Sequence, residues 1–182
     1  MKTYLDKNVY EAALERIAYC FQEFDNVLVA FSGGKDSGVL LNLCYNYADE
    51  HGLLDKLTMY HLDYEAQYQM TTEYVTRTFL EQFPGIRKMW YCVPIKAQSA
   101  CALGEPYWTP WDAAKKKLWV RAMPENPYVV HEGNLDVPFR HGMVDYEFQD
   151  KLSRHFAKKR GTTAVMVGLR ADESLNRYAA VA

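Results

Sequence analysis

The stretch that decides the fold is "VLVAFSGGKDSGVLLNLCYNYA", residues 27–48. It opens with five apolar residues, 27–31, a pattern typical of a strand that is buried on both faces of a parallel sheet. Two glycines, a lysine, an aspartate and two serines follow, and the segment 38–47 is then predicted to be a helix. The stretch therefore predicts a strand that turns through a glycine-rich loop into a helix.

The loop between this strand and helix has the chemistry of an anion site. Gly33 and Gly34 let the backbone turn tightly and approach another group. The first amides of the helix have no acceptor within the helix and lie at the positive end of its dipole. Ser32 and Ser37 add hydroxyl donors, and Lys35 adds a compact positive charge. A phosphate chain is the usual occupant of such a cradle.

Asp36 fits a phosphate site only if its carboxylate binds a divalent metal or accepts hydrogen bonds from backbone amides of the loop. The spacing excludes two common phosphate motifs, GxxxxGK[ST] and GxGxxG. "SGGKDS" (32–37) instead resembles the SGGxDS signature of the PP-loop ATP pyrophosphatase superfamily. This resemblance implies ATP as the ligand and cleavage between its α and β phosphates. It also implies Mg²⁺ as a cofactor, with Asp36 as its one candidate protein ligand, and Lys35 and Asp36 as catalytic residues.

A second signature follows the last predicted strand. "VMVGLRADESLNRY" (165–178) resembles the GxRxxES..R element of phosphoadenosine-phosphosulfate reductase-like proteins, a branch of the same superfamily. By that match the nucleotide-binding candidates are Gly168, Arg170, Glu173, Ser174 and Arg177, with Arg170 also catalytic. Two guanidinium groups beside a helix start can grip phosphate or sulfate in a bidentate way. The alternative is a helix cap, with Arg177 in a surface ion pair.

The N-terminal segment narrows the resemblance. "YLDKNVYEAALERIAYCFQEFDNVLVAFSGGKDS" is similar to the start of the immunoglobulin-binding regulator A family, which belongs to the same branch and has a domain of unknown biochemical function. The similarity extends to Tyr178. Because members of that family continue further, we expect this chain to be a minimal member or one that lacks a C-terminal region.

Strand and helix patterns alternate along the chain and predict one α/β domain, 1–182. The expected fold is a doubly wound, mostly parallel sheet with helices on both faces, Rossmann-like and, by the resemblance, adenine nucleotide alpha hydrolase-like. The ends of the strands at 27–31, 56–63 and 163–169 should surround one crevice. The other predicted elements are a strand at 87–95 and helices at 8–24, 38–47, 70–83, 146–161 and from 172. Residues 96–143 lack periodicity and are predicted to be an irregular, aromatic-rich insertion with a function of its own.

Three polar residues lie at or near the end of the second strand. Asp63 stands where an acid often meets a ribose hydroxyl in doubly wound folds, so it is a nucleotide-binding candidate, with a helix cap as the alternative. Glu65 is a weaker candidate. His61, inside the strand, is predicted to be a packed core histidine.

The insertion carries "KKKLWVR" (115–121), whose basic and aromatic residues can bind a single nucleic-acid strand. The alternative is a solvated helix face with a tryptophan packed beneath it. A protein partner is a further option for 96–143. His131, Glu132, Asp136 and His141 lie nearby, but their spacing matches no known zinc site.

Composition restricts the partners. The 21 basic and 23 acidic residues give a net charge of −2, so no global field attracts nucleic acid or an anionic membrane. The sequence has no run of 18 apolar residues, so no membrane-spanning helix is expected. The four scattered cysteines, the last of them Cys101, predict reduced thiols and a cytoplasmic location. An oligomer is permitted by the insertion and the many tyrosines.

Three functions follow from these expectations. The main one is an ATP-dependent enzyme that transfers an adenylyl group to an unknown acceptor and releases pyrophosphate. A second is a nucleotide-binding regulator that acts through a partner protein without turnover. A third is a protein of the reductase type that handles a sulfonucleotide such as PAPS, although the C-terminal cysteine tail which that chemistry uses has no counterpart here.

Overall fold

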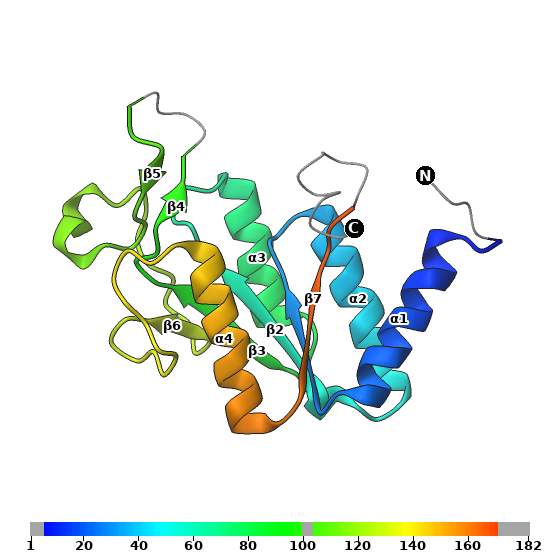
Figure 1. The fold of residues 1–182 in the computed structure, drawn as a ribbon. Helices are drawn as coiled ribbons and strands as arrows, with labels where there is room; N and C mark the ends of the chain where they lie inside the picture. Colours follow the sequence, from blue (N-terminus) through cyan, green and yellow to red (C-terminus); the bar gives the residue numbers. More distant parts are fainter. Residues whose placement is uncertain (1–5, 100–103, 171–182) are drawn as a thin grey trace.

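A five-stranded parallel sheet forms the centre of the computed structural model, which describes residues 6–99 and 104–170 (Figure 1). The strand order is β6-β3-β2-β1-β7. The strands of this sheet are β1 (Asn26–Ala30), β2 (Leu57–Leu62), β3 (Arg87–Cys92), β6 (Val129–His131) and β7 (Thr163–Val167). The helices are α1 (Val9–Glu23), α2 (Lys35–Glu50), α3 (Gln69–Glu81) and α4 (Asp145–Arg160), with 3-10 helices η1 (Leu54–Lys56) and η2 (Ala113–Leu118).

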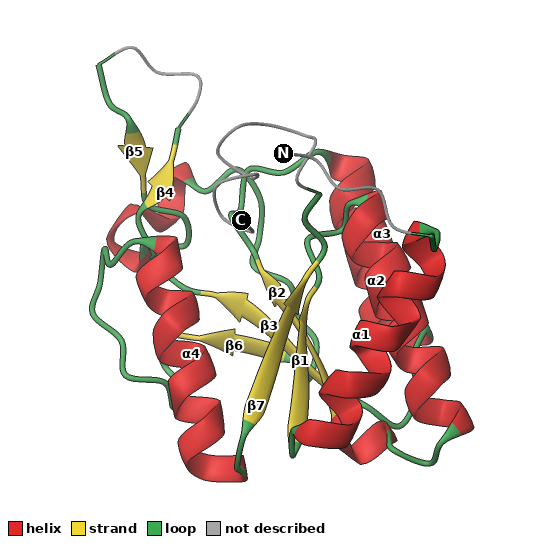
Figure 2. Ribbon diagram, turned by 45° about the vertical axis from the view of Figure 1, so that its right-hand side comes forward, coloured by secondary structure: helices red, strands yellow, loops and turns green. Residues whose placement is uncertain are grey.

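Helices cover both faces of the sheet, as predicted (Figure 2). On one face, α1, α2 and α3 bury apolar side chains such as Phe21, Leu41 and Phe79 against the strands. On the other face, α4 buries Phe148 and Leu152 against side chains that include Tyr91 of β3. The α/β, Rossmann-like fold class that the alternating pattern predicts is therefore confirmed.

The order of the strands creates the switch point that positions the site. From β1 the chain adds β2, β3 and β6 in one direction, and then returns to place β7 on the other side of β1. In open parallel sheets a crevice forms where the order reverses, outside the carboxyl ends of the strands. Here that point lies between β1 and β7, whose residues Ala30 and Val167 are paired.

The last strand differs from its prediction. The apolar run 163–169 predicts a strand that is buried on both faces, but β7 ends the described sheet. Val165 is 42% exposed and Val167 48% exposed. Ala164 and Met166 point to the opposite face, where Met166 packs against the core of α1, α2 and α3.

The insertion is more ordered than its sequence indicates. It supplies β6, which pairs with β3 through Trp90 and Val129 and extends the main sheet. It also holds η2 and a separate two-stranded antiparallel sheet, β4 (Ala97–Gln98) with β5 (Tyr107–Trp108). The helix predicted from 172 lies outside the described residues.

Two further boundaries shift. The helix predicted at 38–47 begins at Lys35, directly after the glycine pair, and the strand predicted at 87–95 ends at Cys92. Within the described part of the chain, no helix is long and apolar enough to span a membrane.

Candidate functional site

The loop after β1 is shaped by its own serines. The backbone N–H of Ser32 donates to Ser37 Oγ at 3.1 Å, and Ser37 Oγ donates to the carbonyl oxygen of Gly34 at 3.0 Å. The two hydroxyl oxygens lie 2.9 Å apart. A hydroxyl has one proton, and Ser37 donates it to the carbonyl oxygen of Gly34 within the loop. The Ser37 side chain is also buried. The hydroxyl of Ser37 therefore shapes the cradle, while the exposed Ser32 can turn toward a ligand.

Gly33 is the position where the loop requires a glycine. Its φ is +81°, in the left-handed region that side chains disfavour. A Cβ there would also lie 2.8 Å from Val75 Cγ2 and 3.0 Å from Thr71 Cγ2 of α3. The glycine thus lets the loop turn sharply while it packs directly on α3.

The helix start faces the crevice. Gly34 is the N-cap of α2, and the amide of Gly38 makes the first helical bond, to the carbonyl oxygen of Gly34 at 3.0 Å. The amides of residues 35–37 therefore have no hydrogen-bond acceptor within the helix. They lie at the positive end of a 16-residue helix, which favours a bound anion.

The second signature meets the first at this point. A Cβ on Gly168 would lie 2.9 Å from the carbonyl carbon of Asp36 and 2.9 Å from the amide nitrogen of Ser37. The chain that leaves β7 thus passes directly against the backbone of the first turn of α2. Two motifs that are more than 120 residues apart in the sequence form one site.

Asp36 lies between two cations. Its Oδ1 is 2.9 Å from Lys35 Nζ, and its Oδ2 is 3.8 Å from Arg170 Nε. The Lys35 side chain is 76% exposed and Arg170 is 55% exposed, so both can reach a ligand in the crevice. Among the residues that the structure describes, no group of three His, Cys, Asp or Glu could hold a metal ion.

A cavity of about 500 Å³ opens beside this loop. Its lining comes from the ends of the three strands predicted to surround one crevice, together with α2 and α4. The lining residues are Ala30, Phe31, Ser32, Gly34, Lys35, Asp36, Ser37, Tyr60, Leu62, Tyr64, Gln149, Val167, Gly168 and Leu169.

Two tyrosines form a wall of the cavity, and α4 holds their hydroxyls. Tyr60 Oη donates to Gln149 Oε1 at 3.1 Å, and Tyr64 Oη donates to Asp145 Oδ2 at 3.0 Å. Burial raises the pKa of Tyr60 to about 12. Burial, together with the nearby Asp145 carboxylate, also raises the pKa of Tyr64, so both phenols keep their protons near neutral pH.

Sequence reasoning missed these wall residues. The alternation of a strand places residues 60, 62 and 64 on one face, so the run "YHLDY" held a usable signal for both tyrosines. Gln149 lies on α4 and is brought to the site by the fold alone.

Asp63 lies at the end of the second strand, as predicted, but its side chain does not reach the crevice. Its side chain is fully buried and does not line the cavity. Both carboxylate oxygens lie 2.6 Å from Arg121 Nη2, and Trp90 Nε1 donates to Oδ2 at 2.7 Å. The expected contact with a ribose hydroxyl is therefore corrected: this acid binds side chains of the protein. It also accepts from the amide of Glu65 at 2.8 Å.

His61 is a core residue, as predicted. It is 1% exposed, and its Nδ1 lies 2.7 Å from the carbonyl oxygen of Phe31, the last residue before the loop. Since a carbonyl oxygen only accepts, Nδ1 carries a proton. Burial lowers the pKa of His61 and favours the neutral ring.

The remaining residues of the second signature, Glu173, Ser174 and Arg177, lie outside the described residues. Their predicted roles stay predictions.

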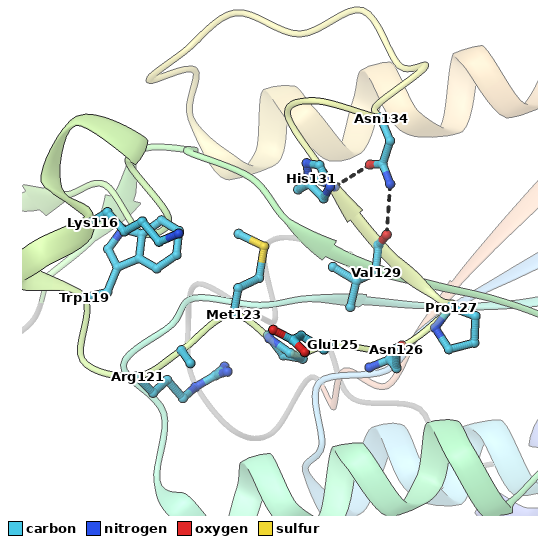
Figure 3. A pocket seen from close by; sticks show the side chains of 12 residues that line it. Lys116, Trp119, Arg121, Met123, Glu125, Asn126, Pro127, Val129, His131 and Asn134 are labelled. Atoms are coloured by element: carbon cyan, nitrogen blue, oxygen red, sulfur yellow. Dashed lines mark hydrogen bonds between the residues drawn. The ribbon is translucent and has the colours of Figure 1, made fainter.

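A second cavity, of about 740 Å³, lies in the insertion (Figure 3). Lys116, Trp119, Met123 and His131 are among its lining residues. Trp119 is not a free stacking platform, because its Nε1 donates to the carbonyl oxygen of Asp112 at 3.0 Å and its ring packs edge-on against another tryptophan. The run 115–117 is exposed. This arrangement matches the alternative of a solvated face with a tryptophan packed beneath it.

The described thiols are poorly suited to nucleophilic chemistry. Burial raises the pKa of Cys44 to about 12, and it also raises the pKa values of Cys20 and Cys92. A thiol that stays protonated is a weak nucleophile. Cys101 lies outside the described residues.

Comparison with known proteins agrees with this geometry. Residues 26–181 match the family model of the phosphoadenosine phosphosulfate reductase domain. The chain is also 33% identical over 180 residues to the uncharacterized protein YbdN of Escherichia coli strain K12. That alignment covers 98% of this chain and 42% of the relative, so the chain spans less than half the length of the curated relative that it matches.

Proposed function

Because this chain belongs to the phosphoadenosine phosphosulfate reductase domain family, we propose that it binds an adenine nucleotide in the crevice between β1 and β7. The proposed reaction is cleavage of ATP between its α and β phosphates, with transfer of the adenylyl group to an acceptor and release of pyrophosphate. One observation carries the proposal: the glycine-rich loop, the start of α2 and the Gly168 backbone converge beside the cavity of about 500 Å³.

The residues present fit a phosphate chain. In the proposed complex the amides of residues 33–37 bind the two phosphates that leave. Lys35 and Arg170 neutralise charge that develops on the phosphate oxygens, and this positioning and neutralisation is the main task of a protein in phosphoryl-type transfer. When bound, Mg²⁺ would neutralise further charge on the phosphates. Asp36 is the carboxylate that the loop offers it, so its other ligands would be phosphate oxygens and water.

The same crevice suits a sulfonucleotide, which is the second candidate ligand. The family name points to phosphoadenosine phosphosulfate as a substrate of the domain. The buried, high-pKa thiols of Cys44 and Cys92 speak against its reduction by these cysteines. A nucleotide-binding regulator without turnover is the third candidate, and a partner protein would then bind the chain according to whether the crevice holds a nucleotide.

The decisive test compares ATP, phosphoadenosine phosphosulfate and adenosine phosphosulfate by calorimetry and then measures pyrophosphate release over a panel of acceptors. Lys35→Ala should lower the rate of pyrophosphate release roughly 100-fold, as expected when one group that stabilises developing charge is removed. Its thermal midpoint should stay unchanged, because Lys35 is exposed. The matched control is Lys117→Ala, an exposed lysine of η2 that should leave the rate unchanged.

Each outcome separates the candidates. Pyrophosphate release that Lys35→Ala slows roughly 100-fold supports the enzyme. Tight nucleotide binding without release across all acceptors favours the regulator. Unchanged turnover in Lys35→Ala contradicts the proposed role of the loop.

A further inference from the structure

The turn after β2 is held by the insertion through two acidic residues. Arg121 binds the carboxylate of Asp63 through Nη2, and its Nε donates to the carbonyl oxygen of Glu65 at 2.9 Å. The Glu65 carboxylate accepts from two backbone amides of the insertion, that of Trp111 at 2.8 Å and that of Val120 at 2.7 Å. Trp111 Nε1 donates to the carbonyl oxygen of Asp63 at 2.8 Å. We call this set of five residues the acid clamp.

The acid clamp is buried and specific. Asp63 has no exposed surface, Glu65 is 4% exposed and Trp111 is 2% exposed. The Arg121 guanidinium also lies 4.9 Å from the centre of the Trp111 ring. A buried carboxylate that loses its cation is strongly destabilised, because the charge is then neither solvated nor paired. The clamp therefore fixes one arrangement of the turn and the insertion.

Backbone strain points to the same conclusion. Glu65 has φ of +66° and Trp111 has φ of +55°, both in the left-handed region although neither is a glycine. Such conformations persist where the surroundings over-determine them, and they gather at functional sites. Here each strained residue lies at one end of the Glu65–Trp111 hydrogen bond.

Tyr64 stands between the two clamped acids and faces the other way. Asp63 and Glu65 point into the insertion, while the Tyr64 side chain lines the crevice and its hydroxyl binds Asp145 of α4. The residues of the phosphate cradle and the side chains of Tyr60, Leu62 and Tyr64 line the same cavity. A nucleotide with its phosphates on the cradle can therefore place its base against the tyrosine wall.

From this geometry we propose that Arg121 is a positioning residue for nucleotide binding: through Asp63 and Glu65, the insertion fixes Tyr64 as the surface against which the base stacks. This inference rests on the proposed function, and it makes the insertion a part of the nucleotide site. Arg121 belongs to the insertion loop that is seen in Figure 3, so the acid clamp also connects the larger cavity to the turn.

The test compares a ligand that has a base with one that lacks it. ATP and inorganic tripolyphosphate are titrated into the whole chain, with the same Mg²⁺ concentration, and their Kd values are measured by calorimetry. Arg121→Met should weaken ATP binding roughly tenfold, the scale of losing one base–aromatic contact, while tripolyphosphate binding changes less than about twofold. Arg121→Lys keeps the charge but not the forked contact, so it should bind ATP more tightly than Arg121→Met and less tightly than the unaltered chain.

Two further variants keep the inference testable if Arg121→Met does not fold. Trp111→Phe removes the Nε1 donor to the carbonyl oxygen of Asp63 and shortens the ring beneath Arg121, and it should show the same selective loss, of a few-fold. Tyr64→Ala should also weaken ATP selectively, and combining it with Arg121→Lys should add little, because both changes act on one contact. The control is Arg154→Lys, which alters an exposed ion pair with Asp150 on α4.

The outcomes separate this inference from the function on which it rests. Equal losses for ATP and tripolyphosphate, or additive effects of Arg121 and Tyr64, overturn the inference and leave the phosphate site standing. Equal affinity of the unaltered chain for ATP and tripolyphosphate also overturns the inference and leaves the phosphate site standing, because the base then contributes nothing to binding. If the unaltered chain binds neither ligand, the proposed function and the inference fail together.

Discussion

Gly168→Ala tests the meeting of β7 and α2, on which the site depends. The added Cβ would lie 2.9 Å from the carbonyl carbon of Asp36, 3.0 Å from its carbonyl oxygen and 2.9 Å from the amide nitrogen of Ser37. All three atoms belong to the main chain at the start of a 16-residue helix, so no flexible side chain can move aside. Restoring ordinary contact of about 3.5 Å requires a shift of roughly half an ångström of β7 or α2.

The magnitude follows from the cost of overpacking. Forcing one extra carbon into a closely packed place costs about 1–3 kcal/mol. For a chain of this size that lowers Tm by roughly 2–12 °C. Since the shift also moves the amides that would bind phosphate, ATP affinity should fall about tenfold, in line with the steep cost of misplaced binding groups.

Thermal unfolding and calorimetry on the same samples check both effects. Gly104→Ala is the matched control, because a Cβ there meets nothing within 4 Å. A Gly168→Ala variant that melts and binds ATP like the control would refute the close approach of β7 to α2. Lower stability with unchanged ATP binding would retain the packing and refute its role in the site.

Two other predictions concern stability. Because burial lowers the pKa of His61 below its ordinary value of 6.5, the unfolded chain binds a proton before the folded chain does, and stability should fall as the pH drops below about 6.5, by at most about 1.4 kcal/mol per pH unit. The free energy of unfolding in urea, measured between about pH 5 and pH 7, should therefore change less with pH for His61→Gln than for the unaltered chain. An equal dependence on pH in both proteins would contradict this origin. Phe148→Ala, in the fully buried core under α4, should cost about 3–5 kcal/mol, whereas Tyr146→Ala, at a 73% exposed position on the same helix, should change stability by less than about 0.5 kcal/mol. A small effect of Phe148→Ala in urea unfolding would show that α4 does not need this contact.

The geometry of the loop after β1 could be predicted from sequence because its determinants are local. The strand 27–31, the glycine pair and the helix start are contiguous, and each follows from short-range sterics and hydrogen bonding. Gly168 is a site candidate through a motif alone, and its close approach to the Asp36 backbone appears only when β7 lies beside β1.

Residues whose role depends on distant partners could not be assigned. The rule for an acid at the end of the second strand points Asp63 at a ribose, but its partner Arg121 is 58 residues away in a segment without periodicity. The exposure of Val165 and Val167 has the same cause, since an apolar run looks alike in a central and an edge strand. β6 has three residues in a proline-rich stretch, too few to show alternation.

Asp36 shows why the two motifs must be considered together. Within the loop alone, an acid beside a phosphate cradle is unfavourable, and a metal is the natural explanation. In the fold, Arg170 comes from the end of β7 and Lys35 from the helix start, and the Asp36 carboxylate lies between them. Two cations that converge on one anion site repel each other until the anion arrives, and a carboxylate between them relieves that repulsion. In the proposed site the acid therefore holds both cations at the crevice without a metal, an arrangement that exists only where β7 and α2 meet.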